Sequence, residues 1–270
     1  MAELAETCEV MAILDPSPRY AGTSHDDATA RAMGYRAALI PGVFVYGHAT
    51  RPALVCWGED WLARGRASIR FRRPVYNGDA LLVARGPLTR KADSIDAEVT
   101  VTRTETGEVV LSGSIGLADR LPEPPRDLAV APTFAPRMTV AAGEAPTGLR
   151  LGSAEAVLAA ETVNQSLADF HETELLFGDK GLIHSGCLIR KTMSDTLGNL
   201  VLPLPVIFTA VDVQNFAPAA VGRSYATAST ITRAWEARGR YYFETEEWLI
   251  ADGQDVVARH IRSNLYALAA

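Results

Sequence analysis

The same order of elements occurs twice along this chain of 270 residues. Each half has a helical stretch, then an apolar helix opening close to a glycine, then four strand-like runs. Antiparallel strands with one buried face need an apolar partner surface, and the apolar helix supplies it. The order, rather than any sequence identity, predicts a degenerate duplication. We expect an α+β fold in which two antiparallel sheets each wrap around a central helix.

The first half contains two helical stretches. Residues 26–33 suit a short helix with acidic residues at its N-terminus, and residues 42–57 are apolar enough for a buried helix. Pro52 is expected to kink the second helix or to end it early. The strand-like runs cover residues 67–76, 80–88, 94–103 and 109–117, with a hairpin turn at Thr106-Gly107.

The second half repeats this order. A helix is expected over residues 153–163 with Ser153 as its N-cap, and a buried helix over 185–197. Strand-like runs cover residues 206–216, 224–233, 240–250 and 255–267, with a turn at Asp252-Gly253. Ile183-His184-Ser185-Gly186 takes the place that Ile40-Pro41-Gly42 has in the first half.

A proline-rich segment separates the halves. Proline donates no amide hydrogen bond and resists helix interiors, so the segment is expected to be an extended linker. The predicted division is a first half over 1–118, a linker over 119–150 and a second half over 151–270. The prolines are Pro122, Pro124, Pro125, Pro132, Pro136 and Pro146.

Composition excludes several classes of function. With 48% hydrophobic and 21% charged residues the chain has the balance of a globular protein, and its net charge of −6 gives no basic field for nucleic acid. No window reaches the length of a membrane span, and the acidic N-terminus has no apolar signal core, so a cytoplasmic chain is expected. The three cysteines and the histidines lack metal-ligand spacing, and no metal or cofactor is predicted.

Several segments of the first half together resemble the MaoC-like hydratases and dehydratases of the hotdog fold. They are His25-Asp26-Asp27, Gly34-Tyr35, Ile40-Pro41-Gly42 and Phe71-Arg72-Arg73-Pro74-Val75-Tyr76-Asn77-Gly78-Asp79. The second half resembles double-hotdog members by layout. The resemblance implies a double hotdog fold and, as substrate, an acyl thioester linked to coenzyme A or to a carrier protein. A homodimer is a further expectation.

The resemblance makes His25 the candidate acid/base residue. Adding water to an enoyl thioester needs a base for the water, an acid for the alpha carbon and donors for the enolate oxygen. Asp26 or Asp27 could orient His25 or act as the second acid/base group; the alternative for both is favourable interaction with a helix N-terminus. In such hydratases an aspartate stands five residues before the histidine, where this chain has Tyr20.

Gly42 is the candidate oxyanion donor, because glycine at a helix N-terminus lets a carbonyl oxygen approach free amides. The alternative is that it only permits a tight turn. Tyr46 and His48 follow it on the same helix and are candidate cavity-lining residues, or core residues with a satisfied polar tip.

The remaining candidates are counterparts in the second half and basic residues. Superposing Gly186 on Gly42 aligns Asp169 with His25, so Asp169 and His171 could form a rebuilt second site or supply the acid that Tyr20 displaced. His184 is the counterpart beside the second helix. The candidate contacts for a phosphate-bearing ligand are Arg72, Arg73, Arg190 and Lys191.

Three functions stay open from the sequence. The first is a hydratase or dehydratase of acyl thioesters. Tyr20 in the place of the aspartate motivates the second, another hotdog enzyme such as a thioesterase, isomerase or cyclase. The third is a non-catalytic module that binds an acyl group or a partner, because fold alone does not settle function.

Overall fold

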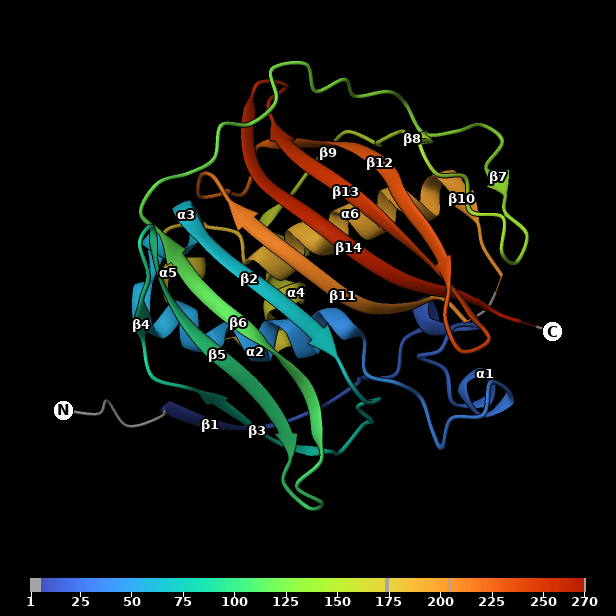
Figure 1. Ribbon diagram of the computed structural model, residues 1–270, viewed down its shortest axis with the longest axis horizontal. Coiled ribbons are helices and arrows are strands. Elements are labelled where there is room, and N and C mark those ends of the chain that lie inside the picture. Colours follow the sequence, from blue (N-terminus) through green and yellow to red (C-terminus); the bar gives the residue numbers. More distant parts are fainter. Residues whose placement is uncertain (1–5, 173–174, 204, 270) are drawn as a thin grey trace.

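The computed structural model describes residues 6–172, 175–203 and 205–269. Its main feature is one twelve-stranded sheet to which both halves contribute (Figure 1). The first half supplies β1 (Glu6–Met11), β2 (Gly65–Phe71), β3 (Ala80–Arg85), β4 (Thr89–Arg90), β5 (Ser94–Arg103) and β6 (Val109–Ala118). The second half supplies β8 (Arg150–Leu151), β9 (Ala156–Val157), β11 (Ile207–Asn215), β12 (Ser224–Glu236), β13 (Arg240–Ala251) and β14 (Asp255–Leu268).

The two halves join edge to edge through β2 and β11. These strands pair antiparallel, with Ile69 opposite Val211, and the strand order is β1-β3-β5-β6-β2-β11-β14-β13-β12-β8. The sheets of the two predicted halves are therefore continuous. A separate parallel pair is formed by β7 (Met138–Thr139) and β10 (Leu200–Val201).

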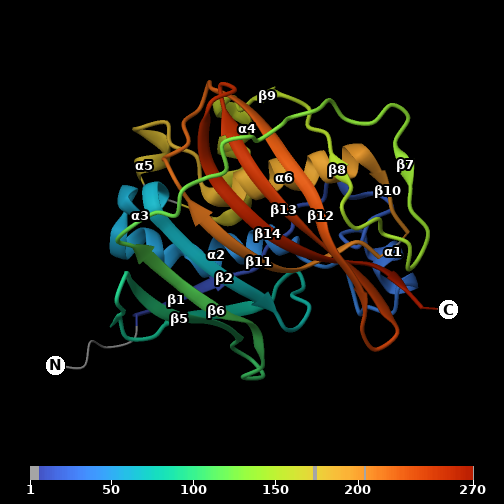
Figure 2. The ribbon, with the colours of Figure 1, turned by 45° about the horizontal axis from the view of Figure 1, so that its top comes forward.

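Two central helices lie behind the sheet, and both views place them on the same side of it (Figure 1, Figure 2). They are α2 (Gly42–Trp57) and α6 (Ser185–Asn199). This arrangement confirms the predicted α+β fold with a helix against the sheet of each half. The shorter helices are η1 (Pro18–Tyr20), α1 (Asp27–Ala32), α3 (Glu59–Arg64), α4 (Ala160–Phe170) and α5 (Leu175–Gly178).

Of the two outcomes expected for Pro52, a kink in α2 or an early end of it, the early end is wrong. The helix continues to Trp57 with Pro52 inside it. An interior proline costs roughly 3 kcal/mol because it removes a backbone hydrogen bond. The residues around Pro52, from Val43 to Leu54, are almost all buried between the sheet and the other helices. Tertiary packing therefore outweighs the local preference.

The helix predicted over residues 153–163 is also wrong at its start. Ser153 is buried and caps no helix: its hydroxyl donates to Asp195 at 2.8 Å and accepts the Thr227 amide at 2.9 Å. Residues 156–157 form the edge strand β9, and α4 begins only at Ala160. A serine followed by acidic residues favours a helix start locally, but here the long-range hydrogen bonds decide its place.

The strands of the first half also differ from the prediction. The strand expected over 67–76 ends at Phe71, because Pro74 has no amide for the ladder and the chain turns at Asn77-Gly78-Asp79. Strand β1, which the sequence analysis did not predict, pairs with β3 at the edge of the sheet.

The segment predicted as a linker packs against the second half. Val140 and Ala145 belong to a buried cluster with Phe243 and Tyr266. The boundaries 1–118, 119–150 and 151–270 stay a prediction. No helix in the described ranges is both long enough and apolar enough to cross a membrane.

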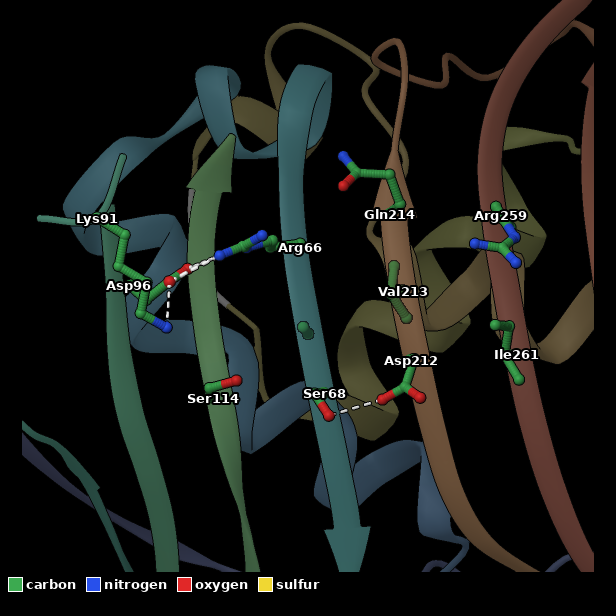
Figure 3. A pocket seen from close by; sticks show the side chains of 11 residues that line it. Arg66, Ser68, Lys91, Asp96, Ser114, Asp212, Val213, Gln214, Arg259 and Ile261 are labelled. Carbon is green, nitrogen blue, oxygen red and sulfur yellow. Dashed lines mark hydrogen bonds and ion pairs between the residues drawn. The ribbon is translucent and has the colours of Figure 1, made fainter. Parts of the chain in front are cut away.

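The outer face of the sheet carries a polar groove of about 360 Å³ at the junction of the halves. Figure 3 shows Arg66 on β2 bonded to Asp96 on β5, and Ser68 on β2 bonded to Asp212 on β11 at 2.6 Å. Arg70 adds an ion pair of 2.8 Å to Asp212. The two contacts of Asp212 hold the halves together from the side opposite the helices.

Candidate active site

A groove of about 550 Å³ beside α1 gathers four of the residues singled out from the sequence. They are Tyr20, His25, Asp26 and Asp27. The rest of the lining comes from the segment that follows β1 and from two further loops. These residues are Leu14, Asp15, Pro16, Ser17, Pro18, Ala21, Ala38 and Asn77.

His25 is held as a neutral imidazole with a defined tautomer. Its Nδ1 lies 2.8 Å from the Leu39 carbonyl oxygen, which can only accept, so Nδ1 carries the proton. Nε2 therefore keeps its lone pair. Burial lowers the pKa of His25, the charge of Arg19 lowers it further, and the Leu39 hydrogen bond acts in the opposite direction. A neutral imidazole with a free Nε2 is the form that a general base needs.

Tyr20 lies against His25 with its hydroxyl held by Arg19. The two rings meet edge to face with centroids 5.6 Å apart, and the Arg19 guanidinium donates to the Tyr20 oxygen at 2.6 Å. Burial is the largest effect on the pKa of Tyr20 and raises it, although Arg19 acts to lower it. The phenol therefore keeps its proton at neutral pH and is available as a donor.

Asp169 reaches this cluster from the second half. Its carboxylate, 7% exposed, accepts from Arg19 at 3.0 Å and from Arg190 on α6 at 2.6 Å. The Arg190 guanidinium also lies over the Phe44 ring at 5.0 Å. Two arginines thus share one carboxylate beside Tyr20.

The numerical match that led to Asp169 does not hold. The helices begin at Gly42 and Ser185, so Ser185 rather than Gly186 is the counterpart of Gly42. His25 precedes α1, whereas Asp169 lies within α4, so the two residues are not equivalent in the fold. Asp169 is instead joined to the first-half cluster through Arg19.

Asp26 and Asp27 have structural contacts. Asp26 is the N-cap of α1 and accepts from the Thr29 amide at 2.9 Å, and the same bonds lower the pKa of its carboxyl. Asp27 accepts the Ala38 amide at 2.7 Å and pairs with Arg31 at 3.3 Å. Both carboxylates therefore fix the loop that carries His25 while lining the groove.

Gly42 opens α2, and the first amides of a helix have no partner further back in the helix. Its N-cap, Pro41, provides no side-chain cap, and Leu39, which accepts from His25, stands three residues before it. A Cβ at Gly42 would lie 3.0 Å from the Phe208 ring, so glycine allows a close approach of helix and sheet.

At the start of α6 a side chain caps a backbone amide, whereas no side chain does so at the start of α2. The N-cap His184 is fully buried, and its Nδ1 accepts the Gly186 amide at 2.9 Å. Burial lowers the pKa of His184 to about 3, so the ring stays neutral and serves as this acceptor. The two halves therefore differ in how the first amides of their central helices are capped.

Tyr46, His48 and His171 lie where the two central helices and α4 meet. The Tyr46 hydroxyl and the Ser185 hydroxyl are 3.1 Å apart, and burial raises the pKa of Tyr46. Burial lowers the pKa of His48 to about 4, with His171 adding to the effect; the two rings are 6.2 Å apart. Among the residues that the structure describes, no group of three or more His, Cys, Asp or Glu side chains is placed to hold a metal.

The four basic candidates lie in three different places: two on the surface, one beside the candidate active site and one in the interior. Arg72 donates to Ser112 at 2.9 Å and Arg73 pairs with Glu108 at 3.0 Å on the exposed end of β2 and the turn beyond it. Arg190 is part of the cluster around Asp169. Lys191 is buried and pairs with Asp195 at 2.5 Å.

Arg19 was not singled out from the sequence. This residue links Tyr20 to Asp169, and its only local signal was its place beside Tyr20. The loop over residues 14–18, which forms one wall of the groove, was not predicted either.

Comparison with solved structures confirms the fold. A structure described as a MaoC domain protein dehydratase from Chloroflexus aurantiacus J-10-fl superposes with a TM-score of 0.66 at 14% identity, over 99% of this chain and 96% of that chain. A conserved hypothetical protein from Mycobacterium tuberculosis with a double hotdog fold gives 0.60 at 16% identity, over 90% and 87%. A 12:0-ACP thioesterase from Umbellularia californica gives 0.55 at 8% identity, over 98% and 94%.

The chain thus has the double hotdog fold seen in MaoC-like dehydratases. No protein-family model matches the sequence, and no curated protein matches it. At these identities the superpositions establish architecture, and the chemistry has to be argued from the residues of the groove.

Proposed function

We propose that this chain is an enzyme of acyl thioesters, linked to coenzyme A or to a carrier protein, and that it hydrates an enoyl group or dehydrates a 3-hydroxyacyl group. The observation that carries the proposal is the tautomer of His25. The Leu39 carbonyl holds the proton on Nδ1 and leaves Nε2 as a base in the groove-lining ring. The double hotdog neighbours described as MaoC dehydratases support the same class.

In the proposed hydration each group has one task. Nε2 of His25 takes a proton from water as the water oxygen bonds to the beta carbon of the enoyl group. The amides at the start of α2 donate to the thioester oxygen as it gains negative charge. Tyr20 donates its proton to the alpha carbon and regains one from solvent, and His25 releases the proton that it took. Dehydration is the reverse.

Arg19 and Asp169 act on Tyr20 rather than on substrate. Arg19 holds the phenol oxygen, and Asp169 with Arg190 holds Arg19. Tyr20, which occupies the place of the usual aspartate, is thereby fixed next to His25. The proposal includes no cofactor; a cytoplasmic location and a homodimer remain part of it.

A thioesterase or another hotdog enzyme is the second candidate. The observation in its favour is Tyr20 itself, because an aspartate is expected there in a hydratase. The structural similarity to a 12:0-ACP thioesterase is consistent with this reading.

A substrate panel separates these functions. The purified chain is incubated with enoyl, 3-hydroxyacyl and saturated acyl thioesters, and both interconversion of the first two and release of free thiol are measured. Interconversion supports the hydratase, whereas thiol release without interconversion supports the thioesterase. Binding of thioesters with neither reaction would contradict both and leave a binding module. If hydration appears only in Tyr20→Asp, the natural chain has another activity.

A further inference from the structure

The interior of the second half, between α6 and the sheet, is polar. Among the described residues, seven buried side-chain nitrogen and oxygen atoms have no hydrogen-bond partner in the protein, and five of them lie here on two strands, β12 and β14, which flank β13. These atoms are Thr227 Oγ1, Ser229 Oγ, both ring nitrogens of His260 and Asn264 Nδ2. Buried polar atoms without partners are rare in native proteins, so such a concentration requires an explanation.

The strand register places these side chains on the face toward the helices. Figure 3 shows Arg259 and Ile261 of β14 at the outer groove, so the alternate residues His260 and Arg262 point inward. Arg262 donates to Thr196 of α6 at 2.7 Å, which confirms this direction. His260 is paired across the strands with Glu247, and Glu247 with Ser229. A polar row therefore crosses β14, β13 and β12 under α6.

The charges in this interior cancel. Arg262 donates to Glu247 at 3.1 Å, and Lys191 pairs with Asp195 at 2.5 Å. Burial alone would raise the pKa of Glu247, but Arg262 and His260 together lower it to about 2, so its carboxylate is charged. Thr227, Ser229 and Asn264 can each donate a hydrogen bond, and the His260 ring can donate from at least one of its nitrogens. The complement of such a set is a neutral group with oxygen acceptors, because an added charge would be buried unpaired.

The polar interior is connected to the candidate oxyanion site. Phe208 lies against Gly42 at the start of α2, and on the sheet Phe208 is paired with Asn264. Asn264 in turn accepts from Arg262 at 2.9 Å and leaves its Nδ2 without a partner. Phe208 and Asn264 therefore lie between the start of α2 and the polar row.

We propose that the interior of the second half is the acyl-chain site and that it selects acyl groups bearing a neutral oxygen, a hydroxyl or a carbonyl, over plain alkyl or carboxylate chains. The inference rests on the proposed thioester function and names its substrate class. Asn264, Ser229 and His260 donate to the oxygen, and the paired Arg262 and Glu247 disfavour a further charge.

The test uses coenzyme A thioethers, which bind without reacting, and the matching enoyl thioesters for turnover. The acyl chains of these compounds have equal length. They are unsubstituted, carry one hydroxyl at each position in turn, or carry a terminal carboxylate. Affinity measured by calorimetry and kcat/KM should both favour one hydroxylated chain over the alkyl chain by at least about tenfold, the worth of one hydrogen bond.

Asn264→Leu removes a donor with little change of volume. It should reduce this preference about tenfold or more, and it should also lower the melting temperature, because the buried Arg262 guanidinium loses the Asn264 oxygen as an acceptor. Ser263→Ala, on the outer face of the same strand, should leave the preference unchanged. Ser229→Ala is the second variant should Asn264→Leu not fold.

The outcomes separate the two proposals. Turnover with equal preference for alkyl and hydroxylated chains in wild type would overturn this inference and leave the proposed function standing. A preference in thioether binding without any turnover would support the acyl site and contradict the proposed function. An unchanged preference in both Asn264→Leu and Ser229→Ala would also overturn the inference.

Discussion

Asp169 and Arg19 form an ion pair of 3.0 Å between residues 150 positions apart. Arg19 belongs to the turn of η1 in the first half and Asp169 to α4 in the second half. Since Arg19 also holds the Tyr20 hydroxyl, the second half positions a residue of the first-half site. Without this contact, Arg19 would still hold the Tyr20 hydroxyl, but it would lose its ion pair with Asp169.

Replacing Asp169 by asparagine should weaken both the site and the fold. The variant removes the charge that Arg19 and Arg190 share, so we expect kcat to fall about tenfold and the free energy of unfolding to fall by about 1–3 kcal/mol. Turnover and urea unfolding measure the two effects. Asp60→Asn, which breaks an exposed pair with Arg64, is the control and should change neither. Unaltered turnover in Asp169→Asn would remove Asp169 from the account.

A methyl group at Gly42 should disturb the start of α2. The added Cβ would lie 3.0 Å from the Phe208 ring and 3.3 Å from its Cβ, so either the helix or the ring must move. We expect Gly42→Ala to cost about 1–3 kcal/mol of stability and to lower kcat at least about tenfold. Gly178→Ala, where a Cβ meets nothing within 4 Å, is the matched substitution and should be neutral. Equal kcat in Gly42→Ala and wild type would contradict the role of this helix start.

The two buried histidines should make the fold sensitive to acid. The pKa values of His48 and His184 are lowered to about 4 and about 3 by burial, from 6.5. Below pH 6.5 the unfolded chain takes up protons that the folded chain refuses, so stability falls as the pH drops from 6.5 toward 3–4.

We expect each of these histidines to contribute a loss on the order of 2–3 kcal/mol between pH 7 and pH 4.5. Chemical unfolding at pH 7 and at pH 4.5 measures it, and the double variant His48→Gln, His184→Asn should show a shallower fall. Asparagine keeps an acceptor for the Gly186 amide, and glutamine keeps a donor near Phe170. The same pH dependence in wild type and double variant would contradict this origin.

Regular elements with a strong local signal were predictable from the sequence. Strand β5 and helix α2 have the predicted bounds, because alternation in the one and a long apolar run in the other leave few alternatives. Gly42 opens α2 as expected. The order of helix and strands in each half was enough to indicate the fold.

Features set by long-range contacts were not predictable. Ser153 has the local pattern of a helix start, yet its hydroxyl is used by Asp195 and Thr227. In β14 the polar residues His260, Arg262 and Asn264 alternate with others, a pattern that favours a solvent-facing row, but they face α6. The ion pair of Arg19 with Asp169 has no signal in either local sequence.

The most direct test of the account is turnover by His25→Ala compared with wild type on enoyl and 3-hydroxyacyl thioesters. The account predicts a fall in kcat of about 100-fold or more, because the base is lost. It also predicts a loss of stability of only about 1 kcal/mol, because one hydrogen bond to Leu39 is removed. Turnover equal to wild type in a folded His25→Ala variant would contradict it.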